Sequence, residues 1–178
     1  MGDRSIAIRS TNTNENEDAQ YLTFSLSGEM FAIGILAIKE IIEYSQMTSV
    51  PMMPSFVRGV INVRGAVVPV IDLSARFGRK VSDVTRRSCI VIIEAHGDDG
   101  NNQDVGVMVD AVSAVMEIPS SEIEPPPSFG AKIRVDFISG MAKVNGNFVI
   151  VLDVNRVLSV DEMALLSDVS ANENPTAL

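Results

Sequence analysis

The chain of 178 residues contains one cysteine and one histidine, and it has fewer lysines and arginines than aspartates and glutamates. The single cysteine, Cys89, cannot form a disulfide within the chain, which fits a reducing compartment. Nothing near the single histidine, His96, suggests a catalytic triad. The net charge of −9 argues against a nucleic-acid partner, because nucleic-acid scaffolds carry a basic stripe.

Long apolar runs and common enzyme motifs are also missing. No uninterrupted apolar segment approaches the roughly 18 residues of a membrane helix, and residues 1–6 have no apolar core for a signal peptide. The sequence contains no P-loop, H-E-x-x-H, C-x-x-C or G-x-S-x-G motif. The aspartates after His96 do not have the spacing of a calcium loop. We therefore expect a cytoplasmic protein with no catalytic residue, cofactor, bound metal or direct membrane insertion.

What the chain does contain is an internal repeat. The segment 56–72 recurs 81 positions later as 137–153, with seven identical residues at equivalent positions. Self-similarity of this kind indicates a duplicated architecture. The two copies differ at one tip, where Arg64 stands in the first and Asn145 in the second.

Each copy predicts a β-hairpin followed by a short helix. In the first copy the strands are expected at 57–63 and 66–71, around a turn at 64–65. The Asn-Gly pair of the second copy is typical of a type I′ turn, whose twist matches that of the flanking strands. Asp72 and Asp153 stand where an N-cap carboxylate would accept the free amide protons of a helix.

The remaining segments predict further short strands and little helix. Expected elements are strands near 21–26, 30–33, 88–95 and 104–116, a short helix and then a strand within 34–42, and a C-terminal helix at 161–168. Many short strands with glycine turns are typical of β-barrels. We therefore predict a mainly β fold of two pseudo-symmetric five-stranded barrels packed together, with short helices and the C-terminal helix.

The predicted domain organisation follows the repeat. Residues 20–168 form the domain, with barrel one at about 21–87 and barrel two at 88–168. Residues 1–19 are polar and predict a disordered tail, and 169–178 predict a flexible one.

A few residues suggest binding to a partner. Arg64 occupies a turn that accepts asparagine in the other copy, and its planar donor fork suits carboxylates. Glu40 lies in an isoleucine-rich segment, where an outward charge on an amphipathic element is the alternative. Met47, Met52 and Met53 cluster near two prolines; methionine adapts to binding surfaces, although core filling is the alternative.

The run 21–166 resembles the CheW family of chemotaxis coupling proteins. The resemblance rests on the opening Tyr-Leu-Thr-Phe-Ser-Leu, the block Gly-Val-Ile-Asn-Val-Arg-Gly at 59–65, and the following Val-Pro-Val-Ile-Asp-Leu. It implies two SH3-like barrels and an adaptor without catalytic activity. Such adaptors link the cytoplasmic tips of chemoreceptors to the histidine kinase CheA, through the regulatory domain of that kinase. They are recruited to membrane-associated receptor arrays.

The resemblance also implies two sets of contact residues. Receptor binding in a groove between the barrels is expected to use Ile38, Glu40, Gly59 and Arg64, with Val107, Met108 and Val109 lining the other side. Kinase binding is expected near Met47 and Val50. A receptor helix laid in an apolar groove would be a known mode of recognition.

Two other readings remain open from the sequence. The chain resembles equally a coupler of a non-flagellar chemosensory pathway, such as pilus motility. A remoter alternative is a small β-barrel enzyme or ligand-binding protein that uses Asp72, Glu94 or His96.

Overall fold

Eleven strands make up most of the computed structural model, which describes residues 19–96, 100–126 and 137–158. The strands are β1 (Ala19–Leu26), β2 (Glu29–Gly34), β3 (Ile38–Glu43), β4 (Val57–Val63), β5 (Ala66–Asp72), β6 (Cys89–His96), β7 (Asn102–Val109), β8 (Ala111–Ile118), β9 (Ile123–Glu124), β10 (Ile138–Val144) and β11 (Asn147–Leu152). Single helical turns are η1 (Ile35–Ala37), α2 (Leu73–Arg76), η2 (Ser120–Glu122) and α3 (Val154–Val157). The predicted C-terminal helix and both predicted tails, apart from residue 19, lie outside the described residues.

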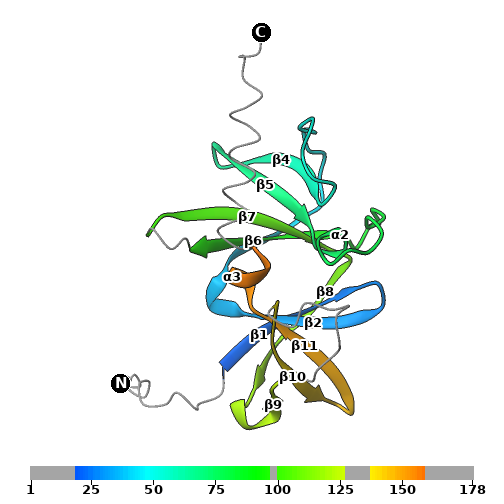
Figure 1. Cartoon of the computed structure of the whole chain (residues 1–178), viewed down its shortest axis with the longest axis vertical. Coiled ribbons are helices and arrows are strands. Elements are labelled where there is room, and N and C mark those ends of the chain that lie inside the picture. The colour runs from blue at the N-terminus through cyan, green and yellow to red at the C-terminus, as the bar shows by residue number, and fades with distance from the viewer. Residues whose placement is uncertain (1–18, 97–99, 127–136, 159–178) are drawn as a thin grey trace.

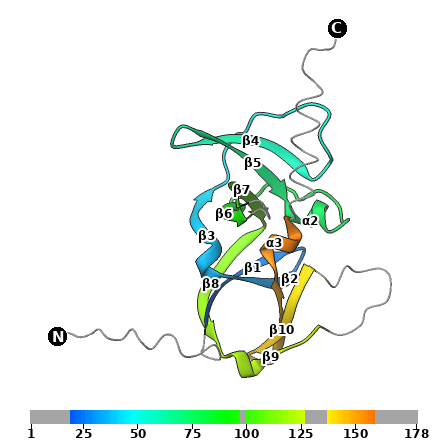
Figure 2. The ribbon, with the colours of Figure 1, turned by 60° about the vertical axis from the view of Figure 1, so that its left-hand side comes forward.

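The strands form two sheets that each curl into a barrel (Figure 1). Barrel A, the lower one, has the strand order β8-β1-β2-β11-β10-β9, and barrel B, the upper one, has the order β3-β6-β7-β5-β4. Figure 2 shows how barrel A curls from β8 round to β9 and β10. The prediction of a mainly β fold with two barrels is confirmed, although the two-residue β9 gives barrel A a sixth strand.

The repeat folds as predicted. β4–β5 and β10–β11 are equivalent hairpins, and their turns begin with Arg64 and Asn145 at φ 52° and 54°. Each hairpin ends at an aspartate whose carboxylate accepts backbone N–H groups of the following turn, α2 or α3. This capping by Asp72 and Asp153 confirms the prediction made from their equivalent positions.

Each barrel nevertheless draws strands from both repeats. β1 and β2 belong to barrel A, whose other strands come from the second repeat, and β6 and β7 belong to barrel B, whose other strands come from the first. The predicted division into 21–87 and 88–168 therefore separates the repeats but not the barrels. The cause is two parallel pairings between repeats, β5 with β7 and β11 with β2, which place the first hairpin of each repeat in the barrel of the other.

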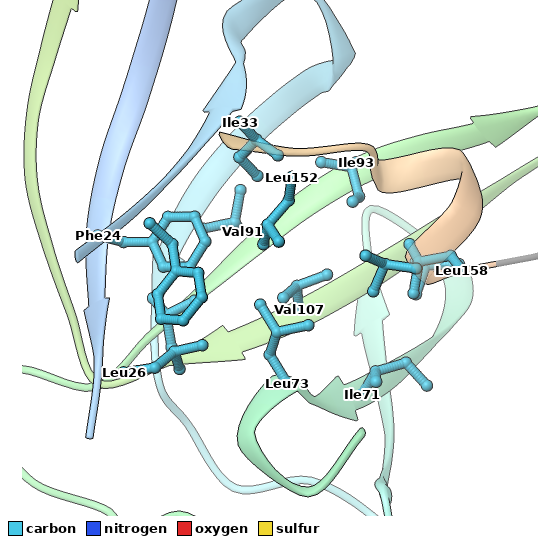
Figure 3. Packing of buried hydrophobic residues seen from close by; sticks show 14 of the residues in the cluster. Phe24, Leu26, Ile33, Ile71, Leu73, Val91, Ile93, Val107, Leu152 and Leu158 are labelled. Carbon is cyan, nitrogen blue, oxygen red and sulfur yellow. The ribbon is translucent and has the colours of Figure 1, made fainter. Parts of the chain in front are cut away.

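The largest apolar core lies between the barrels. β1 and β2 contribute side chains from barrel A, and β6 and β7 contribute them from barrel B (Figure 3). Labelled members are Phe24, Leu26, Ile33, Ile71, Leu73, Val91, Ile93, Val107, Leu152 and Leu158. Two smaller clusters fill the barrel interiors, one with Ile61, Val70 and Met108 in barrel B and one with Ala142, Val149 and Val151 in barrel A. The barrels therefore form one packed unit.

Arg76 joins the two repeats at this core. Its guanidinium lies 5.3 Å from the ring centroid of Phe56 and 4.8 Å from that of Phe137, which are equivalent residues of the two copies. Its Nε donates a hydrogen bond to the carbonyl of Val157 in α3 at 3.1 Å. A cation held between two aromatic rings in a partly desolvated place stabilises their packing.

Two local predictions have different outcomes. The short helix and then strand expected within 34–42 are η1 and β3, which confirms that prediction. The single strand expected at 104–116 is wrong, because Asp110 separates β7 in barrel B from β8 in barrel A. The backbone N–H of Asp110 donates a hydrogen bond to the carbonyl of Ser25, and its carboxylate accepts one from the backbone N–H of Ser27. These two bonds fix the point where the chain crosses between the barrels.

Among the described residues, no helix has the length and apolarity to cross a membrane.

Candidate functional site

Two of the predicted contact residues, Glu40 and Arg64, form an ion pair on barrel B. Glu40 lies on β3 at one edge of the sheet, and Arg64 lies at the tip of the β4–β5 hairpin at the other edge. The curl of the barrel brings these edges together, so that Arg64 Nη1 is 2.6 Å from Glu40 Oε1. The arginine side chain is 78% exposed and the glutamate side chain 24%. Most of the guanidinium donors therefore face solvent and are available to a carboxylate of a partner.

The backbone at Arg64 is under local strain. Its φ of 52° lies in the left-handed region, which costs a residue other than glycine, asparagine or aspartate roughly 1–2 kcal/mol. The turn is otherwise well formed, because Asn62 Oδ1 accepts a hydrogen bond from the N–H of Gly65 at 3.0 Å. The equivalent turn uses Asn145, which suits this conformation better. Strained residues of this kind are concentrated at functional sites, and this one carries a charged side chain at the tip of a hairpin.

An exposed leucine lies in the turn just before β3. Leu36, the central residue of η1, is 99% exposed, whereas Ile38 is partly buried against the core between the barrels. Leu36 is not among the contact residues predicted from the sequence. The available signal was its position, out of phase with Ile35 and Ile38 in a helical pattern, but periodicity alone does not tell an exposed leucine from one that fills a core.

Gly59 is a predicted contact residue that the structure gives a different role. It is buried at a bulge in β4 with a φ of 149°, and a Cβ added there would lie 2.4 Å from the carbonyl oxygen of Thr48. Thr48 and Val60 exchange two backbone hydrogen bonds, of 3.0 and 2.8 Å, which hold the segment after β3 against β4. Gly59 therefore shapes this part of barrel B, because its lack of a side chain allows the Thr48 backbone to approach β4 closely.

The three predicted residues on β7 are not at the surface. Val107 and Val109 belong to the core between the barrels, and Met108 belongs to the interior of barrel B. β7 is paired with β5 along one edge and with β6 along the other, and its two faces are covered by the core between the barrels and by the interior cluster of barrel B. The side chains of Val107, Met108 and Val109 are therefore not available to a partner in this structure.

The predicted kinase-contact residues lie in the connection between β3 and β4. Met47 packs partly against the interior cluster of barrel B, and Val50 is half-buried. Beside them, Met52 is 79% exposed at a φ of 64°. This end of barrel B thus presents apolar side chains to solvent, a feature of protein-contact surfaces.

Asp72, one residue of the enzyme alternative, has a structural role. Its carboxylate is fully buried and accepts hydrogen bonds from the N–H of Ala75 and from the N–H and hydroxyl of Ser82. The Arg58 Nη1 atom lies 3.5 Å from it. These contacts occupy both oxygens, so the group is not open to a substrate.

Asp72, Glu94 and His96 also do not converge on one site. In register, Asp72 pairs with Met108, which pairs with Ile90, so Glu94 is four residues further along β6. Four residues of strand correspond to roughly 13 Å. Across the residues that the structure describes, no group of three or more His, Cys, Asp or Glu is placed to hold a metal ion.

Comparison with known proteins identifies the family. The profile of the CheW-like domain matches residues 20–162 of the chain. The chain belongs to the CheW-like domain family. It is 30% identical over 165 residues to the chemotaxis protein CheW of Klebsiella aerogenes, a match that covers 93% of this chain and 96% of that protein. It is 33% identical to the chemotaxis protein CheW of Bacillus subtilis, covering 77% and 85% respectively.

A solved structure of a CheW-like protein has the same fold. The scaffolding protein TtCheW from Thermoanaerobacter tengcongensis is similar with a TM-score of 0.71 and 33% sequence identity, over 82% of this chain and 90% of that one. Family membership agrees with the resemblance read from the block at 59–65. In this CheW-like domain, that block supplies both the buried Gly59 and the exposed Arg64.

Proposed function

We propose that this chain is an adaptor without catalytic activity that couples the cytoplasmic tips of chemoreceptors to the histidine kinase CheA. The observation that carries the proposal is the Glu40–Arg64 pair, a charged tip held at a strained turn, with the exposed Leu36 four residues before Glu40 in the chain. Membership of the CheW-like domain family supports the adaptor role. The protein would act in the cytoplasm, at receptor arrays.

The receptor contact would combine burial with a directed charge. Leu36 would lose its exposed apolar surface against a receptor helix, a gain of roughly 1.5–3 kcal/mol for a fully buried leucine. Arg64 would place the same helix by donating to a carboxylate, while Glu40 holds the guanidinium in position. Single contacts of this size are weak, and an array strengthens them by multivalency.

The kinase contact is proposed at a second exposed apolar site of barrel B. Met47 and Val50 would form its partly buried base and Met52 its exposed part. Methionine side chains adapt to irregular partner surfaces, which suits a contact with the regulatory domain of a kinase.

The direct test is ATP turnover by the cognate kinase, mixed with receptor fragments, with and without this chain. Strong activation only when all three proteins are present is the expected result. Absence of activation, with the chain folded and the kinase competent, would contradict the proposal.

The charged tip can be tested without disturbing the fold. Arg64→Asn copies the residue of the equivalent turn, so removal of strain offsets loss of an exposed ion pair, and the free energy of unfolding should change by less than about 0.5 kcal/mol. Receptor affinity should fall roughly tenfold, as for loss of about 1.4 kcal/mol of contact. Chemical denaturation and receptor binding are the measurements.

The matched control for this tip is Lys143→Asn, which removes a cation from the equivalent hairpin of barrel A. It should leave receptor affinity unchanged. Equal losses in the two variants would mean that net charge matters and Arg64 itself does not.

The exposed leucine gives a second test. Leu36→Ser should leave stability within about 0.5 kcal/mol, because the side chain is 99% exposed, but should weaken receptor binding about tenfold. Isothermal calorimetry with a receptor fragment measures the effect. Val115→Thr on β8 of barrel A is the control for loss of an exposed apolar side chain. Unchanged binding by Leu36→Ser would remove this residue from the contact.

A further inference from the structure

A basic segment interrupts this acidic protein between α2 and β6. Residues 79–87, named here the basic loop, carry four of the 14 lysines and arginines of the chain and a single acidic residue, Asp83. The four cations are Arg79, Lys80, Arg86 and Arg87. The loop therefore has a local charge of opposite sign to the net charge of −9 of the whole chain.

The basic loop has no regular structure, yet it is fixed at its start and middle. The backbone N–H of Arg79 donates to the carbonyl of Ser74 at 3.0 Å, and its guanidinium is 2.8 Å from Glu29. Ser82 donates its N–H and its hydroxyl to the buried carboxylate of Asp72. These contacts tie the loop to the end of the β4–β5–α2 unit.

The end of the basic loop is fixed in the same way. Thr85 donates its N–H to the hydroxyl of Ser88 at 2.9 Å and accepts the N–H of Ser88 at 3.2 Å. The carbonyl of Ser88 accepts the N–H of Tyr44, which follows β3. A loop that is already ordered loses little conformational entropy when it binds, so its side chains are preorganised.

The side chains of the basic loop that point outward are of two kinds. Lys80, Arg86 and Arg87 are exposed and form no ion pair with another described residue. Between them, Val81 is 40% exposed and Val84 47% exposed. Cations that have no ion-pair partner among the described residues therefore alternate with two exposed valines, and the loop presents a mixed charged and apolar surface.

We propose that the basic loop is a docking surface for an acidic protein segment that carries apolar side chains between its carboxylates. The guanidinium groups of Arg86 and Arg87 match carboxylates by paired donors, and the two valines give the segment apolar surface to bury. The partner binds in an extended or helical form across the loop.

An anionic lipid surface is another partner that four cations could attract, and the net charge of the chain argues against binding to lipid. A net charge of −9 opposes approach to a uniformly anionic plane, while a short acidic segment meets only the loop. The attraction between the loop cations and the carboxylates of such a segment acts within a Debye length, about 8 Å at physiological salt.

The residues of the basic loop are not among those of the receptor contact proposed above. Arg64 lies just before β5, which spans Ala66–Asp72, and the middle of the loop is held at the other end of that strand by Asp72. Figure 2 shows β3 and α2 on opposite sides of barrel B, so the start of the loop lies away from β3, whereas its end lies beside Tyr44, just after β3.

The test uses the full chain and a fluorescent peptide of four Glu-Leu-Glu-Glu repeats, with a glutamine-for-glutamate peptide as the neutral counterpart. Fluorescence anisotropy should show binding of the acidic peptide and not of the neutral one, with an affinity that falls as salt is raised. The charge-reversed variant Arg86→Glu/Arg87→Glu should lose affinity at least about tenfold. The variant Val81→Ser/Val84→Ser should lose affinity for the acidic peptide by a smaller factor, and this factor should not depend on the salt concentration.

The matched control is Lys143→Glu/Arg156→Glu, which changes the net charge by the same amount at exposed cations of the other repeat. The affinity of this control variant for the acidic peptide should fall by less than about twofold. Circular dichroism shows that each variant is folded. Equal losses in loop and control variants, or no binding by the wild-type chain, would overturn the proposal.

The last experiment tests whether the chain binds vesicles of phosphatidylglycerol and phosphatidylcholine. Sedimentation with these vesicles that depends on Arg86 and Arg87, without binding of the acidic peptide, would assign the loop to lipid and also overturn it. Neither receptor nor kinase takes part in these experiments, so their outcome is independent of the coupling assay.

Discussion

Gly59→Ala is expected to lower the free energy of unfolding by roughly 2–4 kcal/mol. The new Cβ would lie 2.4 Å from the carbonyl oxygen of Thr48 and 3.0 Å from its carbonyl carbon, closer than such atoms approach. The backbone φ of 149° is also one that side chains rarely adopt. Relief requires the Thr48 segment to move, and this breaks the two hydrogen bonds between Thr48 and Val60. Urea unfolding measures the change.

Gly34→Ala is the matched control for this prediction. Gly34 has a φ of −61° and nothing within 4 Å of an added Cβ, so the same methyl group should change stability by less than about 0.5 kcal/mol. Similar destabilisation by both variants would show that the contact with Thr48 is not the cause. The contrast also bears on the receptor contact, because any loss of coupling in the Gly59 variant would then come from displacement of the neighbouring segment.

Asp72→Ala is expected to cost roughly 3–5 kcal/mol. The substitution removes a fully buried carboxylate and leaves Arg58 without its charge partner. It also leaves the N–H groups of Ala75 and Ser82 without an acceptor. Thermal and chemical unfolding measure the loss, and faster proteolysis within the basic loop should accompany it, because Ser82 is one of the anchors of that loop.

The duplication supplies the control for Asp72. Asp153 caps α3 in the same way but is only half-buried, and within the described residues its carboxylate accepts only the N–H groups of Asn155 and Arg156. Asp153→Ala should therefore cost about 1 kcal/mol, the usual value for an N-cap. If both variants lost the same amount, the added contacts of Asp72 would contribute nothing.

Local features of the fold could be predicted from the sequence because their signals are local. A glycine after Arg64 or Asn145 specifies a left-handed turn, and an aspartate after each hairpin specifies a cap. The same block also predicted the charged tip. Neither required knowledge of a distant partner.

The exchange of hairpins between barrels could not be predicted in this way. The alternation in β1 shows which face is apolar, but not which strand covers it, and the partner β8 is distant in the sequence. The burial of Val107, Met108 and Val109 was missed for a related reason. An apolar run fits a strand covered on both faces as well as one that lines a groove. The pairing of Glu40 with Arg64 likewise depends on closure of the barrel.

The exchanged hairpins also set an order on folding during synthesis. Barrel B is complete once residue 109 has left the ribosome, because all its strands precede that point. β2 leaves early but must wait for its partner β11, which ends at Leu152. At about 5–20 residues per second this delay is of the order of ten seconds. During that time the apolar face of Leu22, Phe24 and Leu26 can be covered by β6 and β7 but still lacks the side chains of Leu152, Val157 and Leu158, so an early part of the chain is protected in two steps.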